Sequence, residues 1–77
     1  MQRKPVSSSS VRAVGYDEGT HVLEIEFHNG RAYRYRHVPA AVHRLLLLAP
    51  SIGQFVNQQI RPRFDAERLD EAEAEAS

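Results

Sequence analysis

Residues 22–39, VLEIEFHNGRAYRYRHVP, decide the fold of this chain. In the first third, Leu23, Ile25 and Phe27 alternate with glutamates, and this period of two is typical of a half-buried β-strand. His28-Asn29-Gly30 follows as a turn signal. Tyrosines and arginines then alternate on what we expect to be the returning strand. The stretch therefore predicts a β-hairpin.

The length of the turn determines which side chains of the hairpin share a face. A two-residue turn at Asn29-Gly30 would set Arg34 opposite Ile25, and a guanidinium on an apolar face needs a paired, hydrogen-bonded site. A three-residue loop with Gly30 in the left-handed bulge position avoids this cost. We therefore predict the longer loop, with the cross-strand pairs Phe27–Arg31, Ile25–Tyr33, Leu23–Tyr35 and Glu24–Arg34.

This register assigns the tyrosines and the arginines of the returning strand to opposite faces. Tyr33 and Tyr35 lie on the apolar face and are expected to build the core, with their hydroxyls at its rim or on a buried partner. A base-stacking platform would instead need these rings on the open face of the sheet. Arg34 and Arg36 are expected to project from that open face into water.

One more strand is expected before the hairpin. The alternation over residues 11–16 predicts a strand with Val11, Ala13 and Gly15 on one face and Arg12, Val14 and Tyr16 on the other. A turn at residues 17–20 then leads into the hairpin.

Two helices are expected after the hairpin, because the hydrophobic period changes at Val38. Pro39 suits the first position of a helix, and Pro50 ends it. Its apolar face would hold Val42, Leu45, Leu46 and Ala49. Ser51 and Gln54 match a capping box that starts a second helix over residues 52–60. We predict an α+β fold, a three-stranded antiparallel meander followed by two helices packed on one face (β-β-β-α-α).

The chain divides into three parts. Residues 1–8 have few apolar groups to bury and are expected to be a disordered lead-in, followed by a single domain over residues 9–64. Residues 65–77 hold six acids and one base, so they form an acidic tail, either a frayed helix or disordered. Residues 1–64 hold nine bases and four acids, and the formal net charge of zero hides this split.

Composition and spacing argue against several classes of function. The 77 residues include no cysteine, and the four histidines lack the helical spacing of two metal ligands. No histidine–carboxylate pair indicates an enzyme. The longest apolar run, residues 45–49, is too short to span a bilayer. We expect a cytoplasmic, non-catalytic protein with no metal, cofactor or membrane partner.

Arginines supply the candidate binding surface. The candidate nucleic-acid-binding residues are Arg12, Arg31, Arg34, Arg36, Arg44, Arg61, Arg63 and Asn57. Clustered arginines are typical of a surface that contacts phosphates. The alternative is a solvated face that Glu24 and Glu26 partly neutralise. Asn57 also has two possible uses, since its amide can bond a neighbouring backbone group or touch a ligand.

A run of four leucines, residues 45–48, offers a second kind of surface. One helical face accommodates Leu45 and Leu46, so Leu47 or Leu48 is expected to be exposed. Together with a residue of the second helix, such a leucine would form a patch for a homodimer or a protein partner.

Short motifs follow one another along the chain in a defined order. They are Ser9-Ser10, Gly15-Tyr16-Asp17, Phe27-x-Asn29-Gly30, Tyr33-x-Tyr35-x-x-Val38-Pro39 and Ala49-x-Ser51-x-Gly53-x-Phe55-x-Asn57. In this order they resemble the KTSC domain, named for the C-terminus of some lysyl-tRNA synthetases and also found as a free-standing bacterial protein. The resemblance covers about residues 8–64. Members often have Tyr-Phe-Asn where this chain has Phe55-Val56-Asn57, and the acidic tail lies outside the family pattern.

The resemblance has structural and functional implications. It implies structural roles for four motif residues, Tyr33, Tyr35, Ser51 and Gly53. The synthetase context implies RNA binding. We therefore expect a small binding module for nucleic acid, RNA in particular. The alternative is an interaction module that uses Leu47 and Leu48 for self-association or for a protein partner.

Overall fold

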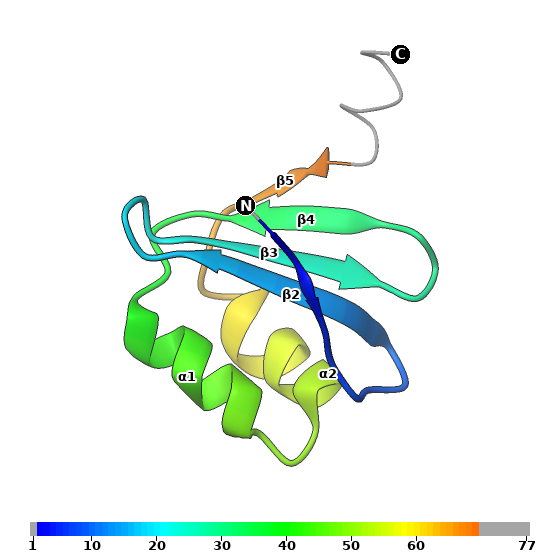
Figure 1. Cartoon of the computed structure of the whole chain (residues 1–77). Helices are drawn as coiled ribbons and strands as arrows, with labels where there is room; N and C mark the ends of the chain where they lie inside the picture. Colours follow the sequence, from blue (N-terminus) through cyan, green and yellow to red (C-terminus); the bar gives the residue numbers. More distant parts are fainter. Residues whose placement is uncertain (1, 70–77) are drawn as a thin grey trace.

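Within residues 2–69, which the computed structural model describes, an antiparallel sheet of five strands is covered on one face by two helical segments (Figure 1). The strands lie in chain order across the sheet and are β1 (Lys4–Pro5), β2 (Val11–Asp17), β3 (Val22–Phe27), β4 (Ala32–Tyr35) and β5 (Ala66–Arg68). The α+β class is confirmed, and the predicted meander corresponds to β2-β3-β4. The edge strands β1 and β5 lie outside the predicted β-β-β-α-α order.

The β3–β4 hairpin has the predicted three-residue loop. Gly30 has a positive φ of 89°, and the backbone N–H of Phe27 donates to the carbonyl oxygen of Arg31 at 2.8 Å. The observed pairs are Leu23–Tyr35, Glu24–Arg34 and Ile25–Tyr33, as predicted. Both tyrosines therefore lie on the helix-covered face, where Tyr35 is buried and Tyr33 is half-buried.

A β-bulge in β2 changes the predicted alternation of that strand. Val11 pairs with Phe27 and Ala13 pairs with Glu26, so Arg12 is an extra residue in the ladder. Because of this insertion, Val11 joins Val14 on the core face, whereas strict alternation would have separated them. The predicted two-face assignment of residues 11–16 is therefore wrong for Val11.

Helix α1 (Ala40–Leu48) begins after Pro39, which precedes the first helical turn in an extended conformation. It ends before Pro50, as the sequence predicted. Leu46 is fully buried, but Leu45, which was expected beside it on the buried face, is 57% exposed. Consecutive helical residues point about 100° apart, so Leu45 points away from the narrow stripe along which Leu46 packs against the core. The prediction for Leu45 is therefore wrong.

The second helical segment consists of α2 (Ile52–Phe55) and the π-helix η1 (Val56–Ile60), which together match the predicted helix over residues 52–60. Its serine cap is confirmed, since Ser51 Oγ accepts from the backbone N–H of Gln54 at 3.3 Å. The π-helical half was not predicted. Its wider turns include a bond of 2.9 Å from the N–H of Arg61 to the carbonyl oxygen of Val56.

The core lies between the sheet and the helices. Its buried members come from every layer, and they are Val11, Val14, Leu23, Ile25, Tyr35, Val38, Leu46, Val56 and Ile60. The hydroxyl of Tyr16 donates to the carbonyl oxygen of Val38 at 2.5 Å, which ties β2 to the segment that leads into α1.

Both ends of the described chain contribute strands where none was expected. Lys4 and Pro5 of the expected lead-in pair with β2, and half-buried Val6 packs against the core. In the expected acidic tail, residues 66–68 form β5, and Leu69 is only 7% exposed. Burial of these few apolar side chains accounts for the added order. The remainder of the tail, residues 70–77, lies outside the described residues.

Gly53 permits close contact between the second helical segment and the serine tract. A Cβ built on Gly53 would overlap Ser10 Oγ. The tract itself is folded into a turn, because Ser8 Oγ accepts from the backbone N–H of Val11 at 3.2 Å. The structural role implied for Gly53 is therefore to let this turn lie against the helix.

Candidate nucleic-acid interface

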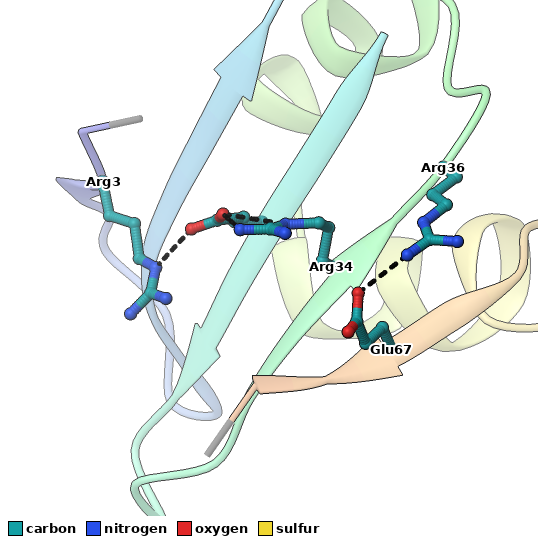
Figure 2. A network of polar contacts seen from close by, with 5 residues as sticks. Arg3, Arg34, Arg36 and Glu67 are labelled. Atoms are coloured by element: carbon teal, nitrogen blue, oxygen red, sulfur yellow. Dashed lines mark hydrogen bonds and ion pairs between the residues drawn. The ribbon is translucent and has the colours of Figure 1, made fainter. Parts of the chain in front are cut away.

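The open face of the sheet carries a buried glutamate held by two arginines. Arg34 donates from Nε and Nη2 to Glu24 Oε2 at 3.2 and 2.9 Å, and Arg3 Nε donates to Oε1 at 3.0 Å. Figure 2 shows the side chains of Arg3 and Arg34 pointing toward one another, with dashed lines that mark their bonds to Glu24. Burial acts to raise the pKa of Glu24, but the hydrogen bonds from Arg34 and Arg3 outweigh it and lower that pKa below its ordinary value.

Arg36 is paired as well. Its Nη2 donates to Glu67 Oε2 of β5 at 2.9 Å (Figure 2). Arg34 and Arg36 are predicted from the sequence to project into water on this face, as candidate phosphate contacts or as cations that Glu24 and Glu26 partly neutralise. In the structure Glu24 engages Arg34 and Glu67 engages Arg36, and both arginine side chains stay partly exposed.

A different pair of arginines meets at the rim of the helix-covered face. Arg31 follows the hairpin loop and Arg61 follows η1, and the two line a small hollow of about 140 Å³. Phe27, Asn29 and Tyr33 complete its lining. We name this site the Arg31–Arg61 hollow.

The walls of the Arg31–Arg61 hollow are aromatic. The rings of Phe27 and Tyr33 meet edge to face, with centroids 5.8 Å apart and an interplanar angle of 79°. Tyr33 also lies beside Tyr35, with centroids 6.4 Å apart. The predicted position of the tyrosines is confirmed for the core, and Tyr33 in addition reaches the rim.

Asn57 of η1 positions one of the two cations. Its Oδ1 accepts a hydrogen bond of 3.2 Å from Arg61 Nη1, one helical turn further on. Burial raises the pKa of the Tyr35 hydroxyl above its ordinary value. The positive charge of Arg61 acts on the same hydroxyl and partly offsets that rise. Asn57 therefore bonds a neighbouring side chain, which is neither of the two uses considered from the sequence.

The charge around the hollow is of one sign. The sequence has no acid between Glu26 and Asp65, and among residues 2–69 neither Arg31 nor Arg61 forms an ion pair. The five residues that line the hollow include these two arginines and no acid. Two cations beside aromatic edges are the elements that bind a phosphate and its attached base.

The remaining candidates are dispersed over the surface. Arg12 is exposed at the bulge of β2, and Arg44 is exposed on α1. Arg63 lines a separate groove between the helices. The structure thus brings together Arg31, Arg61 and Asn57 of the predicted set, and it does not bring the others to them.

Two lining residues were missed as site residues. Phe27 and Asn29 appeared in the sequence only as strand and turn positions. The predicted Phe27–Arg31 pair was the available signal, because it places an aromatic ring beside an arginine at the end of the hairpin.

The family model of the KTSC domain matches residues 7–64. This chain belongs to the KTSC domain family. An uncharacterised protein of Stutzerimonas stutzeri is 44% identical over 63 residues, covering 82% of this chain and 89% of that protein. The crystal structure of a KTSC domain protein from Yersinia pestis matches with a TM-score of 0.82 at 38% identity, covering 87% of this chain and 94% of that one.

The KTSC domain is also similar to one region of a much longer protein. A lysine–tRNA ligase of Nostoc punctiforme is 39% identical over 61 residues, which are 79% of this chain and 11% of the ligase. The similarity to a synthetase segment and to a free-standing protein confirms the resemblance inferred from the motifs.

In the described part of this KTSC domain, no helix is long and apolar enough to cross a membrane. Among the same residues, no three His, Asp, Glu or Cys side chains are grouped to hold a metal ion. The expectations of a cytoplasmic location, no cofactor and no catalysis stay predictions.

Proposed function

We propose that this KTSC domain is a small non-catalytic module that binds single-stranded RNA through the Arg31–Arg61 hollow. The observation that carries the proposal is the pairing of two arginines, neither in an ion pair within residues 2–69, with the aromatic walls of one hollow. A phosphate would lie between the guanidinium groups, and a base would stack on the ring of Tyr33 or Phe27.

The size of the hollow sets the expected strength of binding. Two arginines contact one or two phosphates, so binding is weak and depends on salt. For single strands, the logarithm of the affinity falls with the logarithm of salt concentration by about 0.7 per phosphate contacted. The slope for this domain should therefore be about −0.7 to −1.4.

The ligase relative supports RNA over DNA as the ligand. That relative is a lysine–tRNA ligase, and 11% of its length is similar to this domain. A module attached to such an enzyme would add contacts to its RNA. The free-standing protein would retain the same surface, and its target would be another RNA.

The test is an NMR titration of the ¹⁵N-labelled full chain with short single-stranded RNA and DNA at low salt. We expect the amide and arginine side-chain signals of Arg31, Asn57 and Arg61 to shift first, with smaller shifts for DNA. Shifts confined to Arg34 and Arg36 would contradict the proposed site. No shift with either oligonucleotide would contradict nucleic-acid binding as a whole.

A further inference from the structure

A second concave surface lies between α1 and the α2–η1 segment. It encloses about 450 Å³, and we name it the helical groove. Its apolar lining comes from both helices and from the turn after η1, and consists of Val42, Leu45, Ala49, Pro50, Phe55 and Phe64. None of these residues lines the Arg31–Arg61 hollow, so the two surfaces are distinct.

The apolar surface continues from the groove onto the outside of α1. Leu45 is 57% exposed, and Leu48, three residues later on the same stripe, is 80% exposed. Leu47 is 48% exposed and lines a different hollow, beside Tyr16 and His43. The prediction that Leu47 or Leu48 is exposed is confirmed, since both are, but the concave part of the surface includes Leu45 instead.

The polar groups around the helical groove are cationic or neutral. Arg63 lines one end, and Arg44 lies one turn before Leu48 on α1. The other polar side chains of the lining are Ser51, Gln54, Gln58 and Gln59. The absence of acids between Glu26 and Asp65 in the sequence extends over both helices. An occupant that complements this surface has apolar side chains flanked by carboxylates.

We propose that the helical groove docks an amphipathic acidic segment of a partner protein. Two or three apolar side chains of the segment would fill the groove between Leu45 and Phe55, and its carboxylates would meet Arg63, the one charged residue of the lining. This is the helix-in-groove mode of recognition, in which apolar anchors recur at helical spacing. The proposal concerns a different surface from the RNA site and does not depend on it.

Charge decides against a second copy of the chain as the occupant. In a twofold-symmetric dimer the same patch meets itself, so the interface would hold the Arg63 of both copies and no acid from either groove lining. Like charges set against each other at an interface are unfavourable. A partner segment with acidic residues turns the same cations into attractive contacts.

The test uses a synthetic helical peptide of about 16 residues, with leucines at positions i, i+3, i+4 and i+7 and glutamates elsewhere. A control peptide has lysine in place of every glutamate. Each is titrated into the ¹⁵N-labelled full chain. We expect only the acidic peptide to bind, with shifts at α1, α2 and residue 64. We further expect Leu45→Ser and Arg63→Gln each to weaken binding about fivefold to tenfold.

Three outcomes would overturn the proposal. The lysine peptide could bind as tightly as the acidic one, or anionic phosphatidylglycerol vesicles could bind while the acidic peptide does not. Alternatively, the same signals could shift with protein concentration alone, with dimers in sedimentation equilibrium. Leu45 is exposed, so Leu45→Ser should fold, and it should bind RNA as the unmodified chain does. The two titrations therefore distinguish a failure of peptide docking from a failure of RNA binding.

Discussion

Glu24 and Arg34 face each other across β3 and β4 and share two hydrogen bonds of 3.2 and 2.9 Å on one carboxylate oxygen. The other oxygen accepts from Arg3, which precedes β1. This arrangement removes Arg34 from the set of available phosphate ligands. The bond between Arg3 and Glu24 also links the N-terminal edge of the sheet to β3 at its centre.

Glu24→Gln should lower the free energy of unfolding by about 2 kcal/mol, since the glutamate is 5% exposed and breaking a buried ion pair is costly. The cost stays below that of a fully buried pair because both arginines retain contact with water. Urea unfolding at neutral pH measures it. Glu26→Gln is the matched control, since Glu26 lies 3.8 Å from Arg3 and is more exposed, and it should change stability by less than about 0.5 kcal/mol.

The contribution of Glu24 should depend on pH in a defined direction. Its pKa is lowered in the folded state, so its stabilisation is complete above the ordinary glutamate pKa and disappears as pH falls through the lowered value. The difference in stability between the unmodified chain and Glu24→Gln should therefore shrink in acid. A difference that stays constant down to strongly acidic pH would contradict the ion-pair account.

Gly53→Ala should destabilise the fold by less than about 1 kcal/mol, because its Cβ would overlap only Ser10 Oγ, which can rotate to another rotamer. Ser10→Ala removes that atom, and the double variant should recover most of the loss, since alanine is otherwise the better helical residue. Thermal unfolding of the two single variants and the double variant gives the coupling directly. Additive effects would show that the two residues do not meet.

Removing the acidic end of the chain should strengthen RNA binding. Deletion of residues 65–77, the choice that sequence alone suggests, would also remove β5 and the nearly buried Leu69 and should therefore destabilise the fold. Deletion of residues 70–77 removes four acids and leaves that strand in place. We expect a gain in affinity of about threefold at low salt that vanishes at high salt. The physical reason is that the acidic tail would compete with RNA for the arginines, and unchanged affinity at low salt would contradict that competition.

Much of the fold could be predicted because its strongest signals are local. The hairpin register follows from keeping arginines out of the core, and the serine cap follows from Ser51 and Gln54. The bulge at Arg12 leaves no comparable signal, because an extra residue shows only when a strand is laid against its neighbour. β1 and β5 were missed because two or three residues carry no measurable period.

The site was predicted less well because it depends on tertiary contacts. The pair of Arg34 and Glu24 was predicted correctly, because the two residues face each other across one hairpin. Glu67, the partner of Arg36, is 31 residues away in the sequence and belongs to a segment that was expected to be a frayed helix or disordered. Arg31 and Arg61 line one hollow although 30 positions separate them in the sequence, and no pattern in either segment reveals this proximity.

The most direct test compares Arg61→Gln with Arg36→Gln in binding a fluorescent single-stranded RNA of about ten nucleotides at low salt. Both variants lose one exposed arginine charge, and they differ in position and in the ion pair that Arg36 forms with Glu67. If RNA binds in the Arg31–Arg61 hollow, Arg61→Gln should weaken binding about fivefold to tenfold and Arg36→Gln less than about twofold. Equal losses, or a larger loss for Arg36→Gln, would contradict this account.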